Sequence, residues 1–442
     1  MRKKSMKFGS SKEKRDMSPE EKLIAASESG NAALVKRLIK KGVDANFIEN
    51  DELGYTALHY AAFNGHSDVI EDLILAGADS NKVTTDNYSA LMLATLGGFT
   101  DTVEVIFRLS KPDLSIRTTD VTQGHHGLTC LHLAVMSGVD ELVRLLIQQG
   151  AEREATTSLG YTALHLASWL GYSDIVSTLL QEIPSLHGSS ARPDLLLTAA
   201  GHTSLHLAVT SGTVETVALL LEDDASDANI ADPDGYTALH LSVTYQFRPI
   251  TELLLRHGVA VNTQAGPNLE TPLLEATATA DTKAVNLLLQ YSADPTVCNP
   301  ETGFTPLIAA ASGGYEKIVR TILQSVRATA NPNYPRWVCN QQDAYGYTAL
   351  HYAVQLGLEG ITKRLVDAGA AADIVSHYDG RTALDSARAM GAKRLLEYLQ
   401  RAQPPLPEDA DVCSGGRIDP AKRADDSEVR TPTPAVQESE ST

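Results

Sequence analysis

The sequence contains one short segment in several nearly identical copies. Residues 54–59 read Gly-Tyr-Thr-Ala-Leu-His, and the same six residue types recur at 160–165, 235–240 and 346–351. This recurrence constrains the fold more than any average property of the chain, because segments of equal sequence and spacing form equal structural units. The threonine of each copy therefore measures the period of the chain.

The chain has a period of 33 or 34 residues, which is interrupted in three places. Six of the nine intervals between successive threonine positions are 33 or 34 residues long, and the other three are 40, 41 and 43. The positions are Thr56, Ser89, Thr129, Thr162, Thr203, Thr237, Thr271, Thr305, Thr348 and Thr382. A less regular copy covers 19–46 and brings the number of units to about eleven. A period in this range predicts a stack of small helical units.

Each copy also has the residues that two short helices require. Thr56 is a good N-cap residue, and Leu58 and Ala61 follow it at helical spacing. Gly65 can end this first helix in a left-handed conformation, and a second helix with an apolar face is predicted over 69–74. A unit of this size cannot bury its apolar face alone, so its stability must come from stacking on neighbours.

The motif Gly-x-Thr-Ala/Pro-Leu-His-x-Ala at this period resembles the ankyrin repeat. The resemblance implies an all-α repeat solenoid, in which helix-turn-helix units are joined by short β-hairpin loops. It also implies a structural role for the histidine after leucine, which would hydrogen-bond to the threonine hydroxyl and to the backbone to brace adjacent loops. Six copies have this histidine, namely His59, His132, His165, His206, His240 and His351.

Three regions are expected along the chain: a disordered basic arm over 1–18, the solenoid over 19–402, and a disordered acidic tail over 403–442. The arm carries a local net charge of +5 and the tail one of −5. The tail also has few apolar residues, which is typical of a segment that does not fold. The three long intervals predict insertions in loops. These insertions fall near 110–125, 181–199 and 325–343.

The charge of the chain narrows the class of partner. The whole chain carries −18, and because the arm and the tail cancel, the solenoid carries the same charge. Binding to nucleic acid needs a basic surface, so we expect no such partner; an acidic solenoid instead attracts protein partners with a basic surface. No apolar segment is long enough to span a membrane. Four widely spaced cysteines indicate a reducing compartment, the cytoplasm or the nucleus.

The thirteen histidines invite a catalytic or metal-binding interpretation, but six of them hold the repeated structural position. The densest cluster contains His125, His126, Cys130 and His132, of which the last two are repeat positions. No second Cys/His pair at zinc-finger spacing accompanies it. The sequence also lacks the motifs of serine hydrolases, zinc proteases and P-loop nucleotide-binding proteins. We therefore expect no enzyme activity, no cofactor and no metal site.

The residues that differ between copies are the candidates for partner binding, because the resemblance implies a concave recognition surface on the hairpins and first helices. The position between glycine and threonine is aromatic in six of ten copies, including Tyr55, Tyr88, Tyr161 and Tyr236. These rings either bind a partner or pack on the next hairpin. A later position, at the end of the first helix, is large and apolar in four successive copies, as Phe63, Leu96, Met136 and Trp169.

These four apolar residues form an exposed stripe for a partner, unless neighbouring hairpins or insertions cover them. Trp337, in the third insertion, is a further candidate on a loop that either protrudes or folds back. The expected function is that of a non-enzymatic adaptor or scaffold that binds protein on the concave surface. Two alternatives stay open, a regulatory inhibitor that masks a signalling or transcription factor and a substrate-receptor subunit of a ubiquitin ligase complex. The absence of a recognisable adaptor box counts against the second.

Overall fold

The structure is a computed structural model. It describes residues 17–48, 53–119, 126–181, 197–222, 227–266, 268–329 and 331–400. The tail predicted over 403–442 and the arm up to residue 16 lie outside the described residues, so their disorder stays a prediction. The first insertion is described over 110–119, and the second only at 181 and 197–199.

The described residues form 23 α-helices and one 3-10 helix, which confirms the predicted all-α repeat solenoid. The first helices of the eleven units are α1 (Pro19–Glu28), α3 (Ala57–Phe63), α5 (Ala90–Leu96), α7 (Cys130–Ser137), α9 (Ala163–Leu170), α11 (Ser204–Ser211), α13 (Ala238–Thr244), α15 (Pro272–Ala278), α17 (Pro306–Ser312), α20 (Ala349–Gln355) and α22 (Ala383–Ala389). The second helices are α2 (Ala32–Ile39), α4 (Ser67–Leu75), α6 (Thr100–Leu109), α8 (Asp140–Gln148), α10 (Ser173–Leu180), α12 (Val214–Leu221), α14 (Arg248–Arg256), α16 (Thr282–Gln290), α18 (Glu316–Arg327), α21 (Glu359–Asp367) and α23 (Lys393–Gln400). Two elements lie between units, α19 (Tyr334–Cys339) and the 3-10 helix η2 (Asp227–Asn229).

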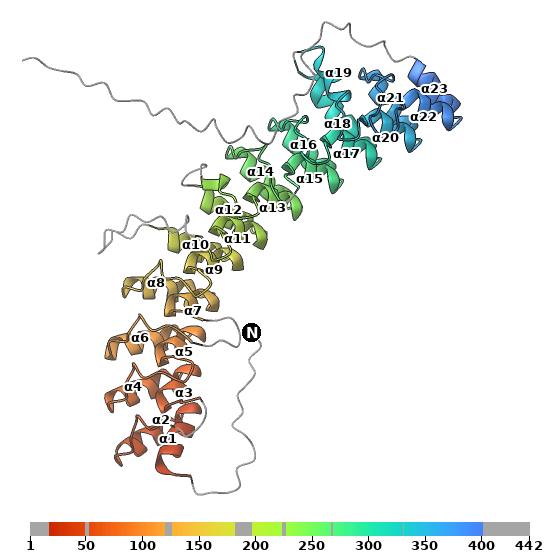
Figure 1. The fold of residues 1–442 in the computed structure, drawn as a ribbon. Coiled ribbons are helices and arrows are strands. Elements are labelled where there is room, and N and C mark those ends of the chain that lie inside the picture. The colour runs from red at the N-terminus through yellow and green to blue at the C-terminus, as the bar shows by residue number, and fades with distance from the viewer. Residues whose placement is uncertain are drawn as a thin grey trace, which may run out of the picture.

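Equivalent helices of successive units stack into two rows. Figure 1 shows the first helices along the inner side of a curved array and the second helices along its outer side. Each first helix contacts the first helix of the next unit from α1 to α22, and each second helix does the same from α2 to α23. The stacking therefore continues from the first unit to the last.

The repeated threonine and histidine begin the first helix together. In α9 the side chain of Thr162 accepts a hydrogen bond from the backbone N–H of His165 at 3.2 Å. Nδ1 of His165 accepts from the backbone N–H of Thr162 at 3.1 Å, so two N–H groups at the start of the helix are satisfied. Gly171 ends the helix with φ 71°, a conformation that residues with a Cβ avoid. The capping roles predicted from the motif are confirmed.

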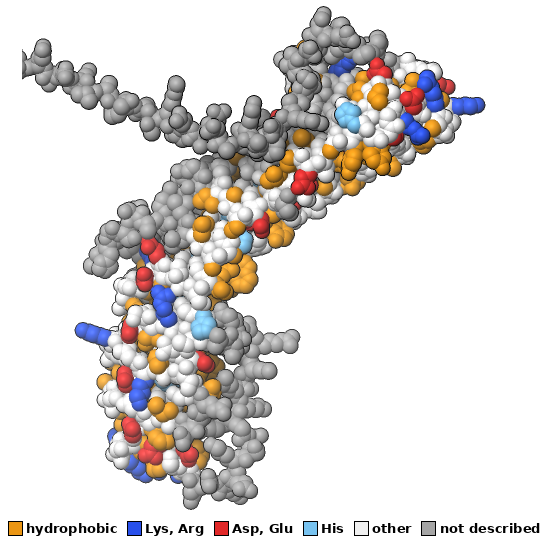
Figure 2. Space-filling view, in the orientation of Figure 1, with side chains coloured by type: hydrophobic (Ala, Val, Ile, Leu, Met, Phe, Trp, Pro, Cys, Tyr) orange, Lys and Arg blue, Asp and Glu red, His pale blue; other side chains and the backbone are white. Residues whose placement is uncertain are grey.

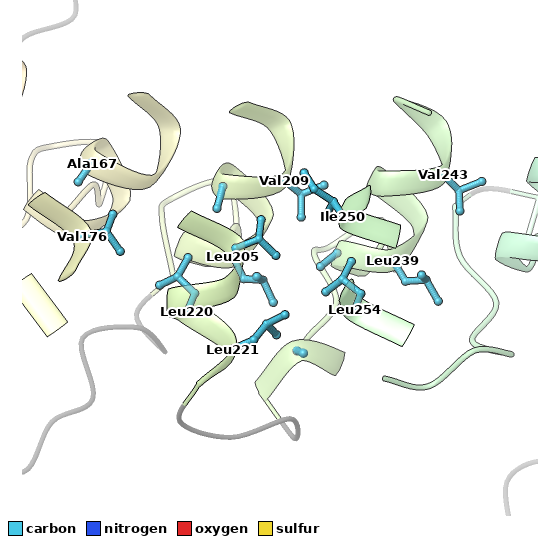
Figure 3. Close-up of a cluster of buried hydrophobic side chains, with 14 of the residues drawn as sticks. Ala167, Val176, Leu205, Val209, Leu220, Leu221, Leu239, Val243, Ile250 and Leu254 are labelled. Carbon is cyan, nitrogen blue, oxygen red and sulfur yellow. The ribbon is translucent and has the colours of Figure 1, made fainter. Parts of the chain in front are cut away.

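The hydrophobic core is a continuous layer between the two rows. Figure 3 shows a part of it in which buried side chains of two successive units meet. They are Leu205 and Val209 from α11, Leu220 and Leu221 from α12, Leu239 and Val243 from α13, and Ile250 and Leu254 from α14. Full burial of one such side chain contributes about 1.5–3 kcal/mol. Because neighbouring units share this layer, each unit depends on the next for its stability.

The loops between units form a second connected layer. Isolated antiparallel bridges, such as the one between Val83 and Ser89, close several of the short hairpins. Backbone hydrogen bonds also join the tip of one hairpin to the next; for example, the N–H of His377 donates to the carbonyl of Tyr345 at 2.9 Å. These bonds hold the side chains at the hairpin tips at a fixed spacing.

Two departures from the motif are accommodated within the stack. The eighth unit has Leu269 where most copies have glycine, and this leucine takes φ 51°. Helix α15 nevertheless lies between α13 and α17 and contacts both. The third insertion forms α19, which packs on α18 and buries Val338 and Cys339. This insertion is therefore a folded part of the outer row and not a protruding loop.

Candidate functional site

We define the inner surface as the side chains at the hairpin tips and at the C-terminal ends of the first helices. These helices form the row on the concave side of the array (Figure 1). Packed helices lie about 10 Å apart, so equivalent residues of successive units form columns at that spacing. Columns of this kind suit an elongated partner, which can contact several units at once. All the predicted site residues except Trp337 lie in two such columns.

The tyrosine column is partly occupied by contacts within the array. Tyr55, Tyr88, Tyr161 and Tyr236 are all half-buried. The rings of Tyr55, Tyr161 and Tyr236 each meet the histidine four residues later at an edge-on or near edge-on angle, with centroids 5.7, 6.3 and 6.1 Å apart. Tyr88 packs against the hydrophobic core. Part of each ring therefore stabilises the scaffold, and the rest of its surface is open to solvent.

The predicted apolar stripe is exposed at its two ends. Phe63 and Trp169 are 40% and 56% exposed. Leu96 and Met136, between them in sequence, are half-buried and packed against the core. A tryptophan with half of its surface in water is an unusual feature of a folded protein, since aromatic side chains normally bury a large area. The two ends of the stripe are the strongest candidates for partner contact among the predicted residues.

The column directly after the stripe also exposes large apolar side chains, which were not among the predicted residues. Its exposed members are Leu170, Tyr245, Leu356 and Met390. Figure 2 shows apolar side chains gathered along the edge of the array that the first helices form. The alignment of copies that identified Phe63 and Trp169 would also have identified these residues, because they hold the next position in each copy. Leu170 extends the exposed surface of Trp169, and the others continue it toward the last units.

The repeated histidines hold adjacent units together. Nδ1 of His132 accepts hydrogen bonds from the backbone N–H and the hydroxyl of Thr129, at 3.2 and 2.8 Å. Its Nε2 lies 3.0 Å from the carbonyl oxygen of Tyr161 in the next unit. Burial lowers the pKa of His132 to about 4, so the ring is neutral at pH 7. The geometry agrees with the structural role that the repeated position implied.

Trp337 lies away from the inner surface. It belongs to α19, which Figure 1 places beside α18 in the outer row. Its ring stacks on that of Tyr334, with centroids 5.7 Å apart and an interplanar angle of 27°. Trp337 therefore does not share a surface with Phe63 or Trp169, and any partner that it contacts would bind the outer side.

The side chains with reactive chemistry are buried or dispersed. Burial raises the pKa of both Cys130 and Cys339 to about 12, so these thiols stay protonated at neutral pH. Within the described ranges, no three His, Cys, Asp or Glu side chains lie close enough together to hold a metal ion. His125, from the cluster noted in the sequence, lies outside these ranges. Among the described helices, none combines the length and the apolar character that crossing a membrane requires.

Comparison with protein families agrees with the period and the fold. The family model for ankyrin repeats in three copies matches four overlapping segments, and the model for a single ankyrin repeat matches one more. The segments are 22–120, 108–190, 183–265 and 260–336 for the first model and 345–377 for the second. Together they cover most of the described solenoid.

Curated relatives are similar over shorter stretches. The chain is 33% identical over 131 residues to the nuclear factor NF-kappa-B p105 subunit of Rattus norvegicus, which is 28% of this chain and 13% of that protein. It is 29% identical over 139 residues to the mitochondrial disaggregase of Bos taurus, which is 31% of this chain and 20% of that protein. It is 27% identical over 136 residues to the target of rapamycin complex 2 subunit AVO2 of Saccharomyces cerevisiae, at 30% of each chain.

The chain thus spans less than a third of the length of each of these relatives, whose names differ from one another. The family models, in contrast, match far more than half of the chain, at the period at which its helices stack. The chain belongs to the ankyrin-repeat family.

Proposed function

We propose that this protein is a non-enzymatic adaptor that binds a protein partner on its inner surface. Ankyrin repeats generally mediate protein–protein interaction. The observation that carries the proposal is the exposure of Phe63 and Trp169, which lie near the C-terminal ends of α3 and α9 in the inner row. Exposed apolar patches on soluble proteins commonly mark interaction sites.

The energetics of interfaces favour these two residues as anchors. Tryptophan is enriched among the residues that dominate binding energies, because it buries a large area with few rotatable bonds. Trp169 is followed by exposed Leu170, so the two side chains offer a continuous apolar contact at the end of α9. The rigid first helices hold these side chains in place before a partner arrives, which reduces the entropy lost on binding.

The overall charge and one relative support the same proposal. An acidic solenoid attracts a partner with a basic surface and accelerates its association. The relative from Saccharomyces cerevisiae, to which the chain is similar over 30% of that protein, is named as a subunit of a complex. We extend this role to the present chain, with the partner on the concave side.

A charge-insertion experiment tests the proposal. The full-length chain and a Phe63→Asp/Trp169→Asp variant would be tagged in cells, and their bound proteins compared by quantitative mass spectrometry. The matched control is Leu75→Asp, because Leu75 is 70% exposed at the end of α4 in the outer row. Circular dichroism at 25 °C and thermal unfolding would show that all three proteins are equally folded.

The expected result is the loss of at least one stoichiometric partner from the double variant and its retention by the Leu75 variant. A partner set that is unchanged by the double substitution, with the fold intact, would reject the inner surface around α3 and α9 as the binding site.

A further inference from the structure

The last units of the array contain a cluster of aromatic rings that come from four different positions of the repeat. Phe304, Tyr352, Tyr347, Tyr378 and Tyr345 form a chain of ring contacts, in this order, across three successive units. The centroid separations along it are 5.6, 5.7, 6.4 and 5.8 Å. These distances are within the range of favourable aromatic pairs. We name these five residues the aromatic cluster.

The cluster combines exposed rings with a rigid base. Tyr345 and Tyr378, at the hairpin tips, are 53% and 74% exposed. The hydroxyl of Tyr352 donates to the buried carboxylate of Asp343 at 2.7 Å. The same carboxylate accepts the backbone N–H groups of Tyr345 and Tyr347, each at 2.9 Å. The exposed rings are therefore held on a fixed backbone and are preorganised for contact.

A second carboxylate lies at the exposed edge of the cluster. Asp379 is in contact with the hydroxyl of Tyr347, and the hydroxyl of Ser376 donates to it, which is the main reason why its pKa is lowered. Asp379 is thus ionised at neutral pH. The cation that faces it is Arg381, on the same hairpin, and this arginine also lowers the pKa of Asp379. Aromatic faces next to an ionised carboxylate are the surroundings that a guanidinium or ammonium group prefers.

The acidic character continues along the inner surface toward the middle of the array. Burial is the first cause that raises the pKa of Tyr236, and the charges of four surrounding carboxylates add to it. These carboxylates belong to Glu275, Asp234, Glu270 and Asp232. His202 lies 3.8 Å from Asp232 at the far end of this group. Tyr236, Glu270, Phe304 and Tyr347 hold the same position in four successive units, so this column leads from the carboxylate group to the aromatic cluster.

We name this continuous surface the aromatic–acidic strip. Its main residues are Tyr236, Glu270, Glu275, Phe304, Tyr347 and Tyr378. We propose that the aromatic–acidic strip binds an extended segment of a partner protein that is rich in arginine or lysine. The inference rests on the proposed adaptor function, and it adds the chemical class of the ligand and a second location, away from Phe63 and Trp169.

The dimensions fit an extended peptide. The strip runs from the seventh unit to the eleventh, which is about 40 Å at the usual spacing of packed helices. A fully extended chain advances about 3.3 Å per residue, so a segment of about 12 residues would cover the strip. Cationic side chains at alternate positions could then face the rings and the carboxylates in turn. An exposed cation–aromatic contact is worth roughly a two- to fivefold change in affinity.

Direct binding of synthetic peptides to the full-length chain tests the inference. The probe is a fluorescein-labelled 12-residue peptide that alternates arginine and glycine, and the reference peptide alternates glutamine and glycine. Fluorescence anisotropy at about 150 mM salt reduces attraction by the net charge alone, since the Debye length is then about 8 Å. One variant removes rings, Tyr345→Ser/Tyr378→Ser, and another removes charge, Glu270→Gln/Glu275→Gln.

Each variant has a matched control on the outer row. Leu75→Ser removes an exposed apolar side chain from α4, and Glu104→Gln/Glu141→Gln removes the same charge from α6 and α8. We expect the arginine peptide to bind and the glutamine peptide not to bind. Loss of the two rings or of the two strip charges should weaken binding about tenfold, and neither control should change it by more than about twofold.

Three results would overturn the inference. Equal binding of both peptides would show that the ligand is not cationic. If the Glu270→Gln/Glu275→Gln and Glu104→Gln/Glu141→Gln variants weakened peptide binding equally, the effect would come from the net charge of the chain and not from the strip. The full chain could also self-associate, with the basic residues 2–15 of one copy on the strip of another. If the Tyr345→Ser/Tyr378→Ser variant abolished such self-association, the ligand of the strip would be a second copy of this chain and not a partner protein. These outcomes differ from a failure of the adaptor proposal, which is read from cellular partners lost with Phe63 and Trp169.

Discussion

Acidification should destabilise the array through its buried histidines. His59, His132 and His240 are neutral in the folded chain, because Nδ1 of each accepts a backbone N–H from the threonine three residues earlier. The proton must therefore be on Nε2, which lies 3.0 Å from a carbonyl oxygen in the following loop in all three cases. A second proton on Nδ1 would face an N–H group and break the hydrogen bonds at the start of the helix.

The magnitude follows from the difference between the folded and unfolded pKa values. Burial lowers the pKa of each of these three histidines from 6.5 to about 4. Their contribution to the free energy of unfolding is fully present above pH 6.5, where the histidines are neutral in both the folded and the unfolded chain. It is lost as the pH falls toward 4, because only the unfolded chain takes up the proton. At pH 5 the free energy of unfolding is therefore lower than at pH 7.5 by about 2 kcal/mol per histidine, or about 6 kcal/mol for the three.

Urea unfolding at pH 7.5 and 5, followed by far-UV circular dichroism, measures this effect. The midpoint is the appropriate quantity, since long repeat arrays can depart from two-state unfolding. The matched variant is His132→Leu, because Met92, Leu274 and Ile308 hold this position in other units. The variant should be less stable at pH 7.5, but acidification should cost it about 2 kcal/mol less than it costs the wild type. An equal loss in both proteins would refute the reasoning.

Three further predictions concern stability and use the same urea assay at pH 7.5. Asn46→Ala should lower the free energy of unfolding by about 1–2 kcal/mol. The Asn46 side chain donates a hydrogen bond to a carbonyl oxygen at 2.9 Å and accepts one from a backbone N–H at 2.8 Å, both in the next unit. An unchanged urea midpoint would contradict this. Leu269→Gly should stabilise the chain by about 0.5–1 kcal/mol through relief of its positive φ, partly offset by the entropy of glycine, and a lower midpoint would count against it. Arg248→Met should lower the free energy of unfolding by about 1–3 kcal/mol, because it leaves the buried carboxylate of Asp281, 3.0 Å away, without its cation. The Arg248→Met/Asp281→Asn variant should recover part of that loss. No recovery would speak against a charge effect.

The fold could be predicted from the sequence because its determinants are local and repeated. Thr162, His165 and Gly171 lie within ten residues of one another, and together they begin and end one helix. The same short pattern recurs along the chain, so an irregular copy such as the eighth is placed correctly by its neighbours. Its Leu269 adopts the backbone conformation of the glycine that it replaces. The period thus determined the stack even where the motif was imperfect.

The third insertion and the site depended on contacts that the sequence does not display. The long interval in this part of the chain predicted a loop. Proline is also suited to the first turn of a helix, however, and Pro335 lies in α19, which buries Val338 and Cys339 as it packs on α18. Leu96 and Met136 have the same apolar character as Phe63 and Trp169. Their burial depends on neighbouring side chains, which a single column of residues does not show.

The exposed hairpin tyrosines were missed for a related reason. Tyr345 and Tyr378 hold different positions in their units, so no column of equivalent residues contains both, yet the bond between their hairpins brings the two rings to 5.8 Å. A surface made of unequal positions from adjacent units becomes visible only when the units are stacked.

Positions that are constant between copies stabilise the array, and positions that vary between copies are available for recognition. The histidines use their polar atoms for contacts within the array, which leaves the half-exposed position four residues earlier free to vary without loss of the fold. That position is Tyr161, next to the start of α9, but Glu270 and then Phe304 further along the same column. The two proposals thus place two recognition surfaces on one scaffold, the apolar surface around Phe63 and Trp169 and the aromatic–acidic strip from the seventh unit to the eleventh. If both proposals hold, a single extended partner with an apolar segment and a basic segment would bind more tightly than either segment alone, because the second contact forms at a high effective concentration once the first is made.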